Sequence, residues 1–221
     1  MSVSDRAAAA AAIVRVCKRL YERGLIAGPE GNISARLDNG EILVTPSGMS
    51  KFDVTAADLV AVDLEGAVVA GTRPPSSEIR VHLRIYNRRP DIRAVVHAHP
   101  PVATGFAVAG YSFIAPVLPE VILQLGTVPL VRYATPGTDA LADNFEPVLK
   151  DSDAFLMANH GAVTIGATLE IAHQRMETLE HAARILLAAR TLGRVNELSA
   201  SDVFALRELG RTGSEAREDR R

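Results

Sequence analysis

Cysteine and long apolar runs are scarce in this chain of 221 residues, and each scarcity excludes a class of protein. Cys17 is the only cysteine, so no disulfide can form within the chain, and its apolar neighbours predict a packed side chain. The apolar run from Ala7 to Val14 is too short to cross a bilayer, and no signal-peptide cleavage region follows it. We therefore expect a cytoplasmic protein with no membrane partner.

An excess of charge of either sign is also missing. The chain has 24 Lys and Arg against 26 Asp and Glu, a formal net charge of −2. Bulk positive charge therefore cannot hold nucleic acid, and we expect no such partner, although a local site can still bind a small anion. With 48% apolar residues and no visible linker, the sequence predicts one domain over residues 1–210. A flexible charged tail is expected over 211–221.

Apolar spacing and turn signals predict a chain in which helices and strands alternate. Helices are expected over 5–23, 76–88, 101–109, 119–125, 138–149 and 169–191. Strands are expected over 32–37, 41–45, 59–64, 67–70, 92–99, 128–133, 154–158 and 162–165. Asn39-Gly40 and Glu65-Gly66 mark two hairpin turns. Strands that cluster in hairpins predict a mixed, largely antiparallel sheet covered by helices.

Histidines form a candidate metal site. His97 and His99 stand two residues apart at the end of a predicted strand, so both side chains leave the same face and can reach one ion. His160 lies in a tight turn between two strands, where a third ligand can be presented. Three neutral nitrogens with an open position are typical of a catalytic zinc site. The alternative is a set of buried, hydrogen-bonded histidines without a metal.

The other histidines and one carboxylate have simpler interpretations. His82, His173 and His181 lie on predicted helices, where we expect surface or interhelical positions rather than ligand roles. Glu78 follows two serines at a predicted helix start, where the helix dipole already favours a carboxylate. Taken from this segment alone, Glu78 is a capping residue.

Three clusters of small polar residues stand at the ends of predicted elements. They are Gly31-Asn32-Ile33-Ser34, Thr45-Pro46-Ser47-Gly48 and Ser76-Ser77. Hydroxyls, an amide and backbone N–H groups can form an anion cradle without fixed positive charge. Each cluster alone is typical of turn or capping chemistry. Together, upstream of the histidine pair, they predict a phosphorylated substrate.

The order of five motifs, G-N-I-S, T-P-S-G, P-S-S-E, H-A-H and N-H-G, resembles the class II aldolase/adducin family. The likeness covers about residues 6–192 and is strongest to sugar-phosphate aldolases such as those acting on L-fuculose 1-phosphate. It implies an α/β fold, a three-layer α/β/α sandwich with a mostly antiparallel central sheet. It also implies a homotetramer with active sites at subunit interfaces.

The resemblance also implies roles for residues. His97, His99 and His160 would hold a divalent metal, Zn²⁺ or another such as Mn²⁺ or Co²⁺. Glu78 would ligate that metal and act as general acid/base. The substrate phosphate would be held by Asn32, Ser47, Gly48, Ser76 and Ser77. The implied enzyme is a class II aldolase that cleaves or forms a ketose 1-phosphate, giving dihydroxyacetone phosphate and an aldehyde through a metal-stabilised enediolate. No Schiff-base lysine is needed.

Departures from the aldolase pattern leave other activities open. Leu118-Pro119-Glu120 stands where the aldolases carry a tyrosine, and no tyrosine follows Tyr133. A decarboxylase of a phosphorylated 3-oxo acid or a dehydratase can use the same site. A 4-epimerase is disfavoured, because the epimerases that this chain resembles carry aspartate at the position of Glu78. Adducin-like relatives are interaction modules that lack the histidine set, which argues for an enzyme here.

Overall fold

A computed structural model of the chain describes residues 3–112 and 116–218. Its helices are α1 (Val3–Glu22), α2 (Ile79–Arg88), α3 (Pro101–Val108), α4 (Asp139–Asp143), α5 (Glu146–Leu149), α6 (Leu169–Thr191) and α7 (Ala200–Glu218). A 3-10 turn, η1 (Ala56–Asp58), and a π-helical turn, η2 (Val121–Leu125), complete the helical elements described. The strands are β1 (Asn32–Arg36), β2 (Ile42–Val44), β3 (Val60–Val62), β4 (Val68–Ala70), β5 (Ala94–Ala98), β6 (Leu130–Val131), β7 (Ala154–Met157) and β8 (Gly161–Gly166).

The strands form one eight-stranded sheet in the order β4-β3-β2-β1-β5-β8-β7-β6. The β1–β2 and β3–β4 hairpins are confirmed. The sheet is mixed, as the strand pattern predicts, and this corrects the mostly antiparallel sheet that the resemblance implies. β6 pairs parallel to β7 because α4 and α5 carry the chain between them, whereas the other described pairs are antiparallel.

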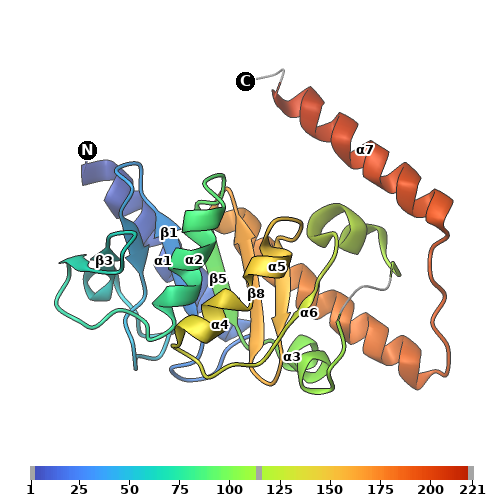
Figure 1. Cartoon of the computed structure of the whole chain (residues 1–221), viewed down its shortest axis with the longest axis horizontal. Helices are drawn as coiled ribbons and strands as arrows, with labels where there is room; N and C mark the ends of the chain where they lie inside the picture. The colour runs from blue at the N-terminus through green and yellow to red at the C-terminus, as the bar shows by residue number, and fades with distance from the viewer. Residues whose placement is uncertain (1–2, 113–115, 219–221) are drawn as a thin grey trace.

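Except at the exposed edge strand β4, both faces of the sheet are buried, and a separate hydrophobic cluster lies on each side. Along β5, Val95 and Val96 point to opposite faces and belong to different clusters. Helices α1, α3 and α6 pack on the side of Val96, and α2, α4 and α5 pack on the side of Val95. Figure 1 shows α2, α4 and α5 in front of the strands. Cys17 is buried in the first cluster, where burial raises the pKa of its thiol to about 12, so its predicted packing is confirmed.

Several predicted elements are longer than those observed, and three differ most from the structure. The helix predicted over 138–149 is divided into α4 and α5, because Pro147 has no N–H to continue a helix and is accommodated in the first turn of a new one. The strand predicted over 128–133 shortens to β6, and the helix predicted over 119–125 is the π-helical turn η2.

Helix α7 is an element that the sequence patterns did not predict. It contacts η2 and extends away from the sheet at the periphery of the chain (Figure 1). It runs past residue 211, where the flexible tail is expected to begin, while 219–221 lie outside the described residues. Within the described ranges, no helix combines the length and apolar character needed to cross a bilayer.

Candidate metal centre and substrate cavity

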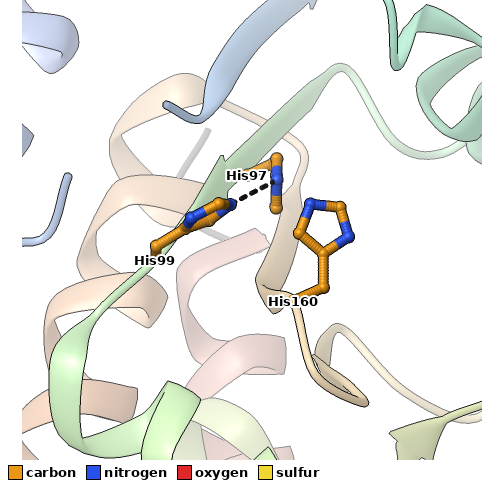
Figure 2. Close-up of side chains that lie close together, drawn as sticks. All are labelled: His97, His99 and His160. Carbon is orange, nitrogen blue, oxygen red and sulfur yellow. Dashed lines mark hydrogen bonds between the residues drawn. The ribbon is translucent and has the colours of Figure 1, made fainter. Parts of the chain in front are cut away.

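Two of the three candidate ligands come from the central strand β5 and its end. Asn32 of β1 and Val163 of β8 flank His97 on either side in antiparallel register. Because these neighbours are themselves held in the sheet, the backbone at His97 has little freedom. His99 follows two residues later and its ring is turned toward that of His97 (Figure 2). The predicted sharing of one face is confirmed.

His160 is brought to the same place by the turn between β7 and β8. Its amide donates to the carbonyl oxygen of Met157 at 3.1 Å, which closes the turn. Asn159 has a φ of 55°, a left-handed conformation that asparagine tolerates better than most residues. Figure 2 shows the His160 ring directed toward the other two rings. The third ligand is therefore positioned by antiparallel pairing of β5 with β8, which sets Ala98 opposite Ala162.

The spacing of the three rings fits a single ion. One nitrogen from each ring lies within 4.8 Å of the others. His97 Nε2 and His99 Nε2 are 3.2 Å apart. Two nitrogens bound tetrahedrally at about 2.0–2.1 Å would lie roughly 3.3–3.4 Å apart, so little movement is required.

The hydrogen bond made by Nδ1 of His97 leaves its other ring nitrogen, Nε2, available to bind a metal. Nδ1 lies 2.9 Å from the carbonyl oxygen of Ala162, and a carbonyl can only accept, so Nδ1 carries the proton. Nε2 can then offer its lone pair to an ion. Metal-bound histidines commonly show this arrangement, in which the outer nitrogen donates to a carbonyl and sets the tautomer.

Glu78 stands at the N-cap position of α2, but its side chain does not cap the helix. Its two oxygens instead approach the histidines: Oε2 lies 3.1 Å from His97 Nε2, and Oε1 lies 3.1 Å from His160 Nε2. Oε1 is buried and accepts no hydrogen bond from the described residues. A buried carboxylate oxygen without a donor, facing imidazole nitrogens, is the chemistry of a shared cation. The capping interpretation of Glu78 is therefore wrong.

The charges in the cluster compete with one another. Burial raises the pKa of Glu78, but the charge of His97 and contacts with both rings outweigh it, so the pKa lies well below its usual range. Burial lowers the pKa of His97, but the Glu78 carboxylate outweighs burial and raises it. Burial, followed by the charges of His97 and His160, lowers the pKa of His99 to about 3. The His99 ring is therefore neutral at physiological pH, as a metal ligand must be.

A cavity of about 200 Å³ opens beside the histidines. The residues that line it are Pro29, Glu30, Gly31, Asn32, Pro46, Ser47, Gly48, Lys51, Ser76, Ser77, Glu78, His99, Pro136 and His160. Every predicted site residue is among them except His97, which contacts Glu78. The structure thus brings together residues that distant segments of sequence supply.

Two features of this cavity were not predicted. Lys51 lines it, and this charged side chain was not among the hydroxyl, amide and backbone groups predicted for the cradle. The available signal was that Lys51 closely follows the T-P-S-G cluster in a chain with only three lysines, Lys18, Lys51 and Lys150. In addition, the amide of Asn32 donates to Glu78 Oε2 at 2.9 Å, so Asn32 orients the carboxylate as well as lining the cavity.

A second cavity, of about 510 Å³, is larger but lies away from this chemistry. Leu118 and Glu120, from the segment where aldolases carry a tyrosine, line it together with Arg23 and His181. It contains none of the predicted site residues. Volume alone therefore does not identify the site, and the convergence of ligands does.

The remaining histidines lie apart from the three candidate ligands. His82 is buried against β1, with Nδ1 2.6 Å from Ser34 Oγ, so a surface or interhelical position is wrong for it. It occupies the inward face of α2, and burial lowers its pKa to about 3. His173 is buried on α6 near Arg19 of α1, which agrees with an interhelical position. His181 is exposed, as predicted.

Substitution of Gly161 by alanine is expected to weaken metal binding. A Cβ there would lie 2.6 Å from the carbonyl oxygen of Ala98, 2.6 Å from His99 Cδ2 and 3.2 Å from His97 Cε1. The backbone must shift, and we expect zinc affinity to fall about 10- to 100-fold, as when the supporting groups of a metal site are altered. Gly105→Ala is the matched control, since nothing lies within 4 Å of its added Cβ. Zinc titration of both variants by calorimetry checks this, and equal affinities would contradict it.

Comparisons with known proteins identify the family of this chain. The profile of the family described as class II aldolase and adducin N-terminal domain matches residues 11–187. A 3-oxo-tetronate 4-phosphate decarboxylase from Pectobacterium atrosepticum is 34% identical, over 93% of this chain and 95% of its own. An L-fuculose phosphate aldolase from Methanococcus maripaludis is 34% identical, over 78% of this chain and 92% of its own. The crystal structure of YgbL from Escherichia coli superimposes with a TM-score of 0.85 at 30% identity, over 92% of this chain and 99% of that one.

The chain therefore belongs to the class II aldolase and adducin N-terminal domain family. Class II aldolases use a divalent metal, and the His97, His99 and His160 group can hold one. The similar proteins include both decarboxylases and aldolases, so membership establishes the superfamily of enzymes and not the individual reaction.

Proposed function

We propose that this chain is a metal-dependent lyase that decarboxylates a phosphorylated 3-oxo sugar acid. This was an alternative at the level of sequence, where the aldolase came first. Similarity to 3-oxo-tetronate 4-phosphate decarboxylases over 93% of the chain is the observation that carries it. The composition of the cavity supports it, because it combines metal ligands, a carboxylate and anion-binding groups.

In this reaction the three histidines would hold the metal, and Glu78 would transfer the proton. A divalent cation held by His97, His99 and His160 would act as a Lewis acid for negative charge that develops on a substrate oxygen. When carbon dioxide leaves, the electrons of the broken bond move toward the 3-oxo oxygen, and carbon 2 must then take up a proton. In this proposal Glu78 would pass a proton from water to that carbon, while the hydrogen bond from the Asn32 side chain would hold the carboxylate in place.

The leaving group distinguishes decarboxylation from aldol cleavage. Aldol cleavage requires a base that removes a proton from the hydroxyl group of the departing aldehyde portion. Carbon dioxide carries no such proton, so no base is needed on that side. Among the residues that the structure describes, none that line the cavity is a tyrosine. The lining contributed by one chain is therefore compatible with decarboxylation.

The aldolase remains the second candidate, since an L-fuculose phosphate aldolase is also 34% identical to this chain. In that reaction the same cation site would stabilise the same kind of charge, and Glu78 would return a proton to the same kind of carbon. The two reactions differ in the leaving group, which is carbon dioxide in the decarboxylation and an aldehyde in the aldol cleavage. The cavity must have room for that group next to the metal site.

Direct comparison of substrates tests the proposal. The zinc-loaded protein is incubated with a 3-oxo-tetronate 4-phosphate and, separately, with L-fuculose 1-phosphate, and carbon dioxide and triose phosphate are measured. We expect equal amounts of carbon dioxide and dihydroxyacetone phosphate from the first and much slower turnover of the second. Triose phosphate from the ketose phosphate, with no carbon dioxide from the oxo acid, would instead establish an aldolase.

Several finer features belong to the same proposal. They are zinc as the resident metal, a homotetramer with sites at subunit interfaces, and a cytoplasmic location. Metal analysis of the purified protein and its mass in solution test the first two.

A further inference from the structure

Lys51 is a buried lysine at the edge of the substrate cavity. Lys51 is only 1% exposed to solvent, yet it is one of the residues that line the cavity. Its Nζ donates to the carbonyl oxygens of Pro29 at 2.8 Å and Met49 at 2.9 Å. These bonds join the loop that contains Pro29 to the loop that contains Met49, and both loops contribute residues to the cavity wall. They use two of the three N–H groups of the ammonium.

Among the described residues Lys51 forms no close ion pair, and the Glu78 carboxylate acts on its charge only from a longer distance. No carboxylate oxygen of those residues lies within the 4.0 Å of Nζ that defines an ion pair, although Glu30 and Glu78 line the same cavity. Burial lowers the pKa of Lys51, which reflects the cost of keeping a cation away from water. A buried cation is usually paired, so an unpaired one beside a cavity indicates a missing anion.

The neutral hydrogen-bond donors of the cavity cannot balance the charge of a bound anion by themselves. The amides of Ser47 and Ser76 already donate to the carbonyl oxygens of Pro74 and Thr45, each at 3.1 Å. Two of the backbone groups that the sequence offered for an anion are therefore occupied. The hydroxyl groups and the other backbone N–H groups of these clusters remain as donors, but none of them carries a net charge. A dianion in this cavity would depend on Lys51 for a formal positive charge from this wall.

We propose that Lys51 binds the phosphate group of the substrate and sets the preference for phosphorylated over neutral substrates. This inference rests on the proposed function only in taking the substrate to be a phosphate monoester. The third N–H of the ammonium provides a charge-assisted hydrogen bond, while the other two hold the loops at the correct separation. Lysine acts here as a point charge with three donors, a role that the longer planar arginine would not reproduce.

A spectroscopic experiment tests this on the unaltered, zinc-loaded protein. The chain has three lysines, Lys18, Lys51 and Lys150, so selective ¹⁵N labelling gives three side-chain signals. Methyl phosphate is titrated, with glycerol as a neutral probe. We expect the Lys51 signal alone to shift with methyl phosphate, and none to shift with glycerol. Saturating methyl phosphate that leaves the Lys51 signal unmoved would overturn the proposal.

Two variants separate the charge of Lys51 from its role in joining the loops. Lys51→Met removes charge and hydrogen bonds, whereas Lys51→Gln keeps a donor without charge. Each should weaken methyl phosphate binding about tenfold or more, the effect of losing one charge-assisted bond, while zinc content is unchanged. Lys18→Met, on the exposed side of α1, is the matched control and should bind as the parent does.

The outcomes are distinct from those of the function test. A folded, zinc-loaded Lys51→Gln variant that binds methyl phosphate within about twofold of the parent would reduce Lys51 to a loop tether. If Lys51→Met fails to fold, the titration of the unaltered chain still decides. Because none of these measurements involves turnover, Lys51 can be confirmed even if the decarboxylase proposal fails, and the converse also holds.

Discussion

Replacing His160 by alanine is expected to remove metal and activity together. The remaining rings, His97 and His99, would offer two ligands 3.2 Å apart at their Nε2 atoms but no third imidazole. If four ligands share a zinc-binding free energy of about 10–16 kcal/mol, each contributes roughly 2.5–4 kcal/mol, so affinity should fall about 50- to 1,000-fold. Loss of the Lewis acid then costs several kcal/mol more in the reaction, or roughly a thousandfold in rate.

The measurement for this prediction is zinc content after dialysis against a weak chelator, followed by assay of the same sample. His181→Ala is the matched control, because His181 is exposed on α6 and lies outside the histidine cluster. Melting temperatures of the zinc-free forms show whether the variant still folds. A His160→Ala protein that kept both zinc and full activity after dialysis would contradict the ligand assignment.

Glu78→Gln is expected to separate metal binding from proton transfer. Zinc affinity should fall, but the three histidines and the side-chain carbonyl of the introduced amide remain, so zinc supplied in excess should stay bound. That carbonyl can also still accept from Asn32, as Glu78 Oε2 does at 2.9 Å. The amide cannot accept and release a proton at neutral pH. We therefore expect the rate to fall by about 10² to 10⁴, the usual contribution of a general acid or base.

Proton exchange provides the direct readout for Glu78. Zinc-loaded protein is mixed with dihydroxyacetone phosphate in D₂O, and incorporation of deuterium at the carbon bearing the free hydroxyl is followed by NMR. The parent should exchange one of these protons, whereas Glu78→Gln should not. Glu65→Gln, in an exposed turn, is the matched control. Exchange at the parental rate in Glu78→Gln would exclude Glu78 from proton transfer.

Much of the local structure could be predicted because it depends on neighbours in sequence. The long helix over 169–191 is predicted with the bounds that α6 has, since Thr168 caps it and apolar residues recur at helical spacing. The His97-Ala98-His99 pair follows from the two-residue period of a strand, which needs no knowledge of the fold. The division of 138–149 into α4 and α5, in contrast, depends on how the chain accommodates Pro147.

The roles of Glu78 and Lys51 illustrate the limit of local reasoning. From its own segment Glu78 is a capping residue, and only the packing of α2 against the sheet turns its carboxylate to the histidines. Lysines are rarely buried in proteins, yet Lys51 is buried and donates to the carbonyl oxygens of Pro29 and Met49. In both cases the environment of the side chain is made by residues that are distant in the chain.

Residue order by itself determined the metal-ligand types, the small polar clusters and the likeness to a family, because these are properties of short segments. Tertiary structure alone decided that His160 meets His97 and His99, that the polar clusters share one cavity, and that a lysine lies among them. The physical reason is that antiparallel pairing of β1 and β8 with β5 brings distant segments to one end of the sheet. Such pairing depends on the burial of both sheet faces, which is a property of the whole fold.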